Sequence, residues 1–256
     1  MNDKITIFGI TFDNVTMNEA IIKIDKEIQK NKKTNSTGFV VTPNVDHLVN
    51  IRKDEEFRKI YKEANLKFVD GMPILFLSKF FKKPFKEKVS GSDLTPRIME
   101  LAYQKEYKVF IFGSKEGVAE LAAKKCKEIY GQEIHIDVLS PEFGFEKNLE
   151  LIESYKEIIK ISSPDILLVS LGSPKGEYFI ASIQDLNIPI SLQVGASIDF
   201  IAGTVKRAPV WMQRFGLEWF YRFIKEPKRM FKRYFVNDMK FINIVAYELF
   251  SKKDRR

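Results

Sequence analysis

The chain has 256 residues, of which 45% are hydrophobic and 30% charged, an ordinary composition for a soluble folded protein. Its single cysteine excludes an internal disulfide and favours a reducing, cytoplasmic location. Residues 204–256 hold 14 Lys and Arg against 5 Asp and Glu, whereas residues 1–203 hold 28 against 29. The same tail holds 12 of the 33 aromatic residues, so a near-neutral body with a basic, aromatic-rich tail predicts contact with an anionic surface or ligand.

Apolar runs typical of strands alternate with amphipathic patterns typical of helices along residues 1–203. Strands are predicted at 4–9, 38–42, 66–69, 108–112, 133–139, 165–171 and 188–194. Helices are predicted at 17–30, 46–64, 73–81, 92–106, 116–130 and 146–161. Because the later strands are apolar on both faces, the pattern predicts an α/β body with a Rossmann-like parallel sheet covered by helices.

The tail predicts a helical, basic appendage to that body. Trp211, Phe215, Trp219 and Phe223 recur every four residues, on one side of a helix that should end at Pro227. A second helix is predicted over 228–250. The aromatic side could pack on the body, but the density of cations favours contact with a membrane or a phosphate group. No segment approaches the ~20 apolar residues of a spanning helix, and no signal peptide is recognisable, so we expect attachment to a membrane without crossing it.

Several segments follow strands that should end at the ligand-binding edge of the sheet. Gly113-Ser114 and Gly172-Ser173-Pro174-Lys175 each link a strand to a helix, where glycines and helix N–H groups can hold a phosphate. Neither loop is a dinucleotide-binding or P-loop motif, and each loop, taken alone, is more typical of a tight turn from strand to helix.

Asp70 is the best candidate for a catalytic group. A carboxylate directly after an apolar strand and before a glycine should lie exposed at that edge, where it could act as a general base. An N-cap for the helix beginning near position 73 is an equally good interpretation. The sequence has no Cys/His cluster and no Asp-x-Asp pair, so no metal site is expected, and cationic side chains would have to neutralise a bound diphosphate.

The chain resembles the WecG/TagA/CpsF glycosyltransferases (glycosyltransferase family 26) from about residue 8 to about residue 234. The resemblance lies in Thr42-Pro43-Asn44, Val69-Asp70-Gly71, Leu171-Gly172-Ser173-Pro174-Lys175 and Lys206-Arg207-Ala208-Pro209, and in segments 57–58, 90–94, 110–113, 164–169, 194–196, 199–203, 211–214, 216–219 and 221–222. So many matches in one order make the resemblance specific.

The resemblance implies transfer of N-acetylmannosamine from its UDP form to undecaprenyl-diphosphate-linked N-acetylglucosamine, with inversion and without a metal. The product would be a lipid-linked disaccharide for wall teichoic acid or a related surface polymer. Asp70 matches the proposed base of the family, and Thr42 and Asn44 match residues that orient the sugars. The best matches to the arginines that meet the leaving diphosphate are Arg222 and Arg229, with Lys232 weaker.

One position departs from the family, whose loop usually reads Gly-x-Pro-Lys-Gln-Glu. Gly176 replaces the glutamine, so a hydrogen-bonding group is missing and either a neighbour substitutes or the sugar differs. Another UDP-sugar, such as N-acetylmannosaminuronic acid or glucose for a capsule or antigen, therefore remains an alternative.

The expected domains are a catalytic body over 1–203 and the appendage over 204–256. The expected partners are the UDP-sugar, the lipid-linked acceptor and the anionic inner face of the plasma membrane. A homo-oligomer is compatible with the sequence. A non-enzymatic nucleic-acid binder, which the basic tail would allow, is disfavoured by the ordered segments at the strand ends, and no nucleic acid is expected.

Overall fold

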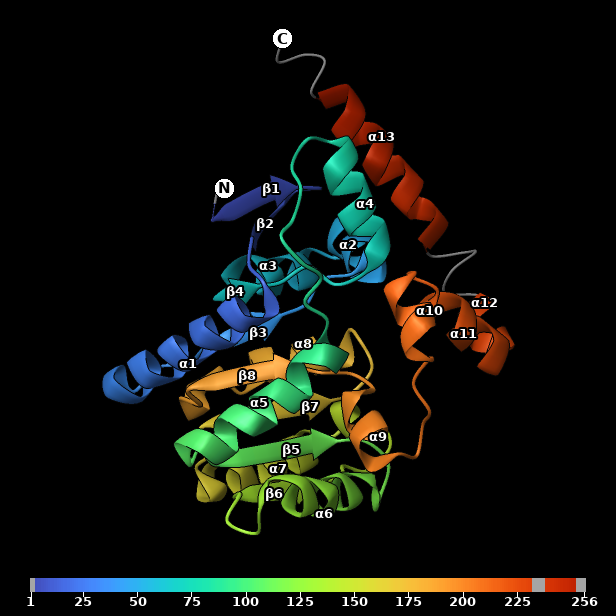
Figure 1. The fold of residues 1–256 in the computed structure, drawn as a ribbon. Helices are drawn as coiled ribbons and strands as arrows, with labels where there is room; N and C mark the ends of the chain where they lie inside the picture. Colours follow the sequence, from blue (N-terminus) through green and yellow to red (C-terminus); the bar gives the residue numbers. More distant parts are fainter. Residues whose placement is uncertain (1–2, 232–237, 252–256) are drawn as a thin grey trace.

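A six-stranded, wholly parallel sheet forms the centre of the protein in a computed structural model, which describes residues 3–231 and 238–251 (Figure 1). The strand order is β4–β3–β8–β7–β5–β6. The strands are β3 (Phe39–Val41), β4 (Leu66–Lys67), β5 (Val109–Gly113), β6 (Ile136–Leu139), β7 (Ile166–Ser170) and β8 (Ile190–Gln193). This confirms the predicted α/β class with a Rossmann-like parallel sheet.

Helices cover both faces of the sheet, as the doubly apolar strands predict. One face is covered by α1 (Met17–Thr34), α5 (Gly91–Lys105), α6 (Val118–Tyr130) and α9 (Ser197–Ala202). The other is covered by α2 (Val45–Lys53), α3 (Glu55–Glu63), α4 (Met72–Phe80), α7 (Leu149–Ser162) and α8 (Lys175–Ser182). Short 3-10 turns lie at Phe145–Lys147 and Gln184–Leu186.

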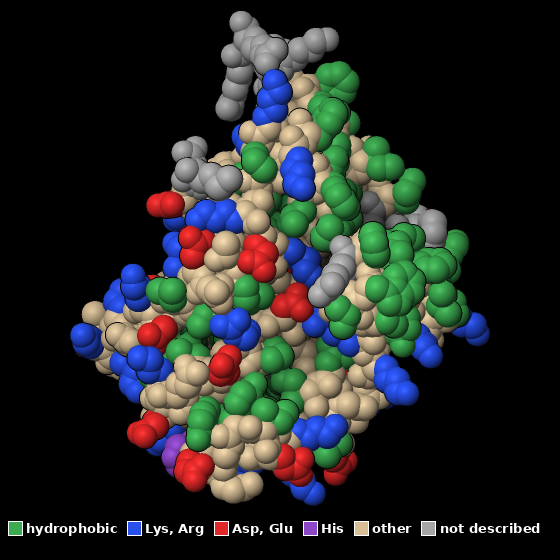
Figure 2. Space-filling model, viewed as in Figure 1, with side chains coloured by type: hydrophobic (Ala, Val, Ile, Leu, Met, Phe, Trp, Pro, Cys, Tyr) green, Lys and Arg blue, Asp and Glu red, His purple; other side chains and the backbone are tan. Residues whose placement is uncertain are grey.

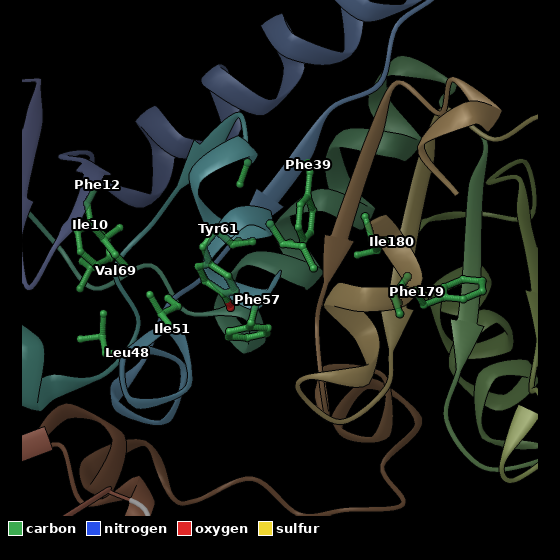
Figure 3. Close-up of a cluster of buried hydrophobic side chains, with 14 of the residues drawn as sticks. Ile10, Phe12, Phe39, Leu48, Ile51, Phe57, Tyr61, Val69, Phe179 and Ile180 are labelled. Carbon is green, nitrogen blue, oxygen red and sulfur yellow. The ribbon is translucent and has the colours of Figure 1, made fainter. Parts of the chain in front are cut away.

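Successive side chains of each strand point to opposite faces of the sheet, so the core consists of two clusters, one on each face. In β5, Phe110 and Phe112 join the cluster under α7 and α8, whereas Ile111 joins the cluster under α1, α5 and α6. Figure 3 shows part of the first cluster, in which Phe57 and Tyr61 of α3 face side chains of α2 and Phe39 of β3. The sheet is therefore buried on both faces, and ligands can approach only at its ends.

The N-terminal segment forms a hairpin rather than the single strand predicted at 4–9. Strands β1 (Lys4–Ile7) and β2 (Ile10–Asp13) pair antiparallel, and Phe8 and Gly9 form the turn with φ of 55° and 80°. Positive φ at both turn residues suits the twist of a two-residue hairpin. Phe-Gly is an uncommon pair for this turn, which is why the sequence pattern did not reveal it.

The helix predicted over 46–64 is two helices, α2 and α3, separated at Asp54. This residue has extended backbone angles, and its carboxylate accepts a hydrogen bond from the Phe57 backbone N–H at 3.0 Å. An aspartate that caps the next helix competes with continuation of the previous one. The continuous amphipathic pattern concealed this break.

The tail also contains a break that the aromatic spacing did not predict. Instead of one helix through Phe223, the structure has α10 (Val210–Arg214) and α11 (Glu218–Lys225), separated at Gly216 with φ of 72°. The predicted end before Pro227 is confirmed, because α12 (Pro227–Phe231) begins there. After a short 3-10 turn (Asp238–Lys240), α13 spans Phe241–Ser251.

Helix α13 returns to the N-terminal hairpin. The rings of Phe241 and Phe8 lie 5.3 Å apart, and the Glu248 carboxylate accepts a hydrogen bond from the Phe8 backbone N–H at 3.2 Å. Within residues 3–231 and 238–251, none of the helices combines the length and apolar character needed to span a bilayer.

Candidate active site

Two adjoining cavities lie at the carboxyl ends of β3, β4, β7 and β8, where open parallel sheets bind ligands. They share one wall, which joins residues from the body and the tail. The shared residues are Asn44, Asp46, Asp70, Ser92 and Arg222. A group bound in either cavity would therefore meet the same carboxylate, Asp70, and the same guanidinium, Arg222.

The first cavity, about 510 Å³, is lined mainly by polar groups from the loops after β3, β7 and β8. These include Thr42, Gly172, Ser173, Gln193 and Asp199. Met230 of α12 also lines it, so the tail contributes to its wall. The abundance of hydroxyl, amide and backbone groups suits a sugar or a phosphate rather than an apolar ligand.

The second cavity, about 390 Å³, is more apolar and lies between α4, α11 and α13. Met72, Pro73, Trp219 and Phe241 supply its apolar wall. Polar groups lie where it approaches Asp70, among them Lys88, Ser90 and Gln213. It can take an amphipathic ligand whose polar end points to the shared wall.

Asp70 lies half-buried between the two cavities and does not cap α4. The N-cap of α4 is Gly71, with no side-chain hydrogen bond. Among the described residues, no group donates a hydrogen bond to the Asp70 carboxylate. Burial raises its pKa from 3.8 to about 6, partly opposed by the nearby Lys88 and Arg222 cations. A carboxylate held without partners at the junction of two cavities is suited to accept a proton.

A chain of ion pairs connects the body to the tail beside Asp70. Arg207 Nη2 lies 2.7 Å from the Asp93 carboxylate of α5, and Arg207 Nε lies 3.4 Å from Glu218. Glu218 also lies 3.4 Å from Arg222 Nη2, and Lys88 Nζ lies 3.2 Å from Asp93. The network places Lys88 and Arg222 near Asp70. Through Arg207, it also links the charged residues of α11 to Asp93 of α5.

A buried network behind the polar cavity holds its two main loops. Glu177 is 1% exposed, and its Oε1 accepts hydrogen bonds from Tyr61 at 3.1 Å and Ser173 at 3.0 Å. His47 Nε2 lies 3.7 Å from the same oxygen, and the Asn44 backbone N–H donates to His47 Nδ1 at 3.4 Å. Burial raises the pKa of Glu177. The network ties the Thr42–Asn44 loop to the Gly172–Pro174 loop.

The structure brings five of the predicted site residues to the cavities, namely Thr42, Asn44, Asp70, Gly172 and Arg222. Asn44 has a second task, because its side-chain oxygen caps α2 by accepting from the His47 backbone N–H at 3.3 Å. Lys232 lies outside the described residues, and so does the side chain of Arg229.

Four predicted residues lie away from both cavities. A Cβ at Gly113 would come within 2.5 Å of the Ser170 carbonyl, so glycine there allows β5 and β7 to approach. The Ser114 hydroxyl bonds that of Ser170 at 2.7 Å. Pro174 lines a separate depression beside the start of α3. Lys175 pairs with Glu146 and lies 5.5 Å from the Phe143 ring.

Sequence reasoning did not identify Lys88, Gln193, Gln213 or Glu218, all of which line the cavities. Lys88 is one lysine among several in its segment, and no local pattern distinguishes it. Gln193 is the last residue of a strand, and its position beside the predicted Gly172 loop follows only from the pairing of β7 with β8. Across 3–231 and 238–251, no group of three or more His, Cys, Asp or Glu side chains could hold a metal ion.

Comparison with known proteins places the chain among glycosyltransferases. A model of the glycosyl transferase WecG/TagA/CpsF family matches residues 5–255. Three relatives share the name N-acetylglucosaminyldiphosphoundecaprenol N-acetyl-beta-D-mannosaminyltransferase. The protein of Bacillus spizizenii is 30% identical over 198 residues, 76% of this chain and 74% of the relative. That of Bacillus subtilis is 29% identical over 227 residues, 88% and 84% of the two chains.

The Staphylococcus aureus (strain MW2) relative is 27% identical over 251 residues, covering 96% of this chain and 92% of its own length. The family match extends through the sheet, the cavities and the tail. The chain belongs to the WecG/TagA/CpsF family of glycosyltransferases.

Proposed function

We propose that this protein transfers N-acetylmannosamine from UDP-N-acetylmannosamine to undecaprenyl-diphosphate-linked N-acetylglucosamine, with inversion at the anomeric carbon. The observation that carries the proposal is the pair of cavities that meet at Asp70 and Arg222. The polar cavity suits the nucleotide sugar, and the more apolar one suits a sugar on a lipid diphosphate. The names of the relatives supply the donor sugar and the acceptor. The product would serve wall teichoic acid or a related surface polymer.

Asp70 is the general base in this proposal. An acceptor hydroxyl in the apolar cavity attacks the anomeric carbon of the donor and gives its proton to the Asp70 carboxylate. The bond between the anomeric carbon and the diphosphate oxygen breaks, and its electron pair leaves with UDP. The raised pKa of Asp70 makes it a stronger base than an exposed carboxylate, yet leaves it largely ionised at neutral pH.

Cationic side chains stabilise the leaving diphosphate in place of a metal ion. Arg222 lines both cavities and lies against the Phe200 ring, 5.5 Å from its centroid. Lys88 lies on the acceptor side. We assign Arg229 and Lys232 to the same task because they follow Arg222 on the tail. Positive charge placed where UDP departs lowers the barrier more than it stabilises the bound substrate. Thr42 and Asn44 orient the sugars.

The tail, over 204–256, brings the active site to the membrane. Figure 2 shows hydrophobic side chains gathered over α10–α12 and continuing towards α13. Trp211, Phe215 and Ile224 are between 57% and 74% exposed. Lys225 and Lys228 are also exposed on the same segment. Exposed aromatics next to cations are typical of a surface that lies in the headgroup region of an anionic bilayer. We therefore propose peripheral attachment to the inner face of the plasma membrane.

A product assay tests the reaction. Purified protein is incubated with UDP-N-acetylmannosamine and a short-chain lipid-diphosphate N-acetylglucosamine in the presence of EDTA, and products are measured by mass spectrometry. We expect the disaccharide, and we expect Asp70→Asn to form none while keeping its fold by circular dichroism. Product from another UDP-sugar alone would overturn the donor assignment. Normal turnover by Asp70→Asn would overturn the assignment of the base.

A further inference from the structure

The side chain of Gln193, which lines the polar cavity, fills the space beside the backbone of Gly176. Gly176 lies in the first turn of α8, and a Cβ at this position would lie 2.6 Å from Cγ and 3.3 Å from Nε2 of Gln193. Carbon atoms that are not bonded do not approach to 2.6 Å. A side chain at position 176 therefore requires Gln193 to move, and Gln193 occupies the volume that such a side chain would take.

The carboxamide of Gln193 is fixed in orientation. Its Nε2 donates to the Leu171 carbonyl oxygen at 2.7 Å. Because a carbonyl oxygen can only accept, the nitrogen must face Leu171 and Oε1 must point away from it. Among the described residues, no group donates to Oε1. Gln193 lines the polar cavity and not the apolar one, so this acceptor is available on the donor side of Asp70.

We propose that Gln193 is a specificity-determining residue for the donor sugar. Its Oε1 accepts a hydrogen bond from a hydroxyl or the acetamido N–H of the sugar. It supplies from β8 the side-chain amide that the family loop carries at the position of Gly176. The inference rests on the proposed function, and it explains the glycine: residue 176 must be small to leave room for the Gln193 side chain.

Gln193→Met tests this contact, because methionine keeps the length of the side chain and removes both hydrogen-bonding groups. We expect kcat/KM for UDP-N-acetylmannosamine to fall at least tenfold. Affinity for UDP, which lacks the transferred sugar, should stay within about twofold by calorimetry. Gln184→Met is the matched control, because Gln184 also donates to a backbone carbonyl, that of Ile180 at 2.8 Å, but lies outside both cavities. It should match the wild type.

A reciprocal exchange separates recognition from packing. Gly176→Gln alone should lose both activity and thermal stability because its Cβ overlaps Gln193. The double variant Gly176→Gln/Gln193→Gly should recover stability and return kcat/KM to within about threefold of the wild type.

Two results would overturn the inference: turnover by Gln193→Met equal to that of the wild type, or equal losses of UDP and UDP-sugar affinity in that variant. Failure of the proposed function is distinct, because the wild type itself would then form no disaccharide.

Discussion

At the scale of single residues, the burial of Asp70 makes its carboxylate more basic and lowers the stability of the folded protein at neutral pH. It is surrounded by Glu218 and Asp93, which raise its pKa, and by Lys88 and Arg222, which lower it. Burial outweighs these opposing charges and leaves the pKa at about 6. The carboxylate is thus basic enough to accept a proton from a sugar hydroxyl in the transition state, yet mostly ionised at pH 7.

We expect kcat/KM to fall as the pH is lowered through about 6, because Asp70 is then protonated and cannot act as a base. Above that range the rate should reach a plateau. Rates of UDP release between pH 5 and pH 8.5 would show the inflection. In Lys88→Met the inflection should move to higher pH, since a cation that favours the ionised form is lost. A flat profile through pH 6 would exclude Asp70 as the titrating base.

We expect Asp70→Asn to be more stable than the wild type at pH 7.5. Because the pKa is raised in the folded state, the native protein loses stability as the pH rises from about 4 to about 6, and the loss persists above that range. The gain should be on the order of 3 kcal/mol. Urea unfolding at pH 7.5 and pH 4 would measure it. A gain of equal size at pH 4 would show that ionisation is not its cause.

At the scale of secondary-structure elements, the tail completes the cavities rather than extending away from the body. Met230 of α12 lines the polar cavity, and Trp219 of α11 and Phe241 of α13 line the apolar one. Arg207 connects this region to Asp93 of α5. By contrast, α9 belongs to the body, because Ile198 and Ala202 are buried against the sheet.

Removal of all residues after Gly203 should leave a folded but inactive body. The two core clusters lie almost wholly within 1–203, whereas Arg222 and the tail walls of both cavities would be lost. Circular dichroism and the disaccharide assay would report fold and activity separately. Full activity in the truncated protein would contradict a role of the tail in the site.

At the scale of the whole molecule, one side of the protein combines charge with apolar surface. The apolar cavity lies beside α11 and α13, whose exposed side chains include Phe220 and Phe250. A protein that rests on the bilayer with this side would face its lipid-linked substrate where the headgroup enters the cavity. Both attraction to anionic lipid and insertion of aromatic rings would contribute.

We expect sedimentation with vesicles of anionic lipid, weaker binding to neutral vesicles, and weaker binding at high salt. Trp211→Ser/Phe215→Ser should lower the bound fraction about tenfold, because two exposed rings would no longer insert. Phe143→Ser is the control, since Phe143 is fully exposed in the loop after β6, away from the tail. Equal losses in the two variants would exclude a membrane surface on α10.

The sequence alone indicated the six strands of the parallel sheet and most of the helices that cover it, because apolar runs and amphipathic periodicity are local signals. It also indicated Asp70, Thr42 and Asn44, which follow strands directly, and the basic tail. The breaks at Asp54 and Gly216 were missed because the hydrophobic pattern continues across both, and a cap or a left-handed glycine acts at one residue.

Only the tertiary structure decided which groups meet. Strand order puts β8 between β7 and β3, so Gln193 lies beside Gly176 and the Gly172 loop, while the Gly113 loop lies one strand further away. Arg207 pairs with Asp93 of α5 and with Glu218 of α11, and this link brings Arg222 to Asp70, about 150 positions earlier in the chain. Local patterns cannot carry this information, because a site between strand ends depends on pairings between segments distant in sequence.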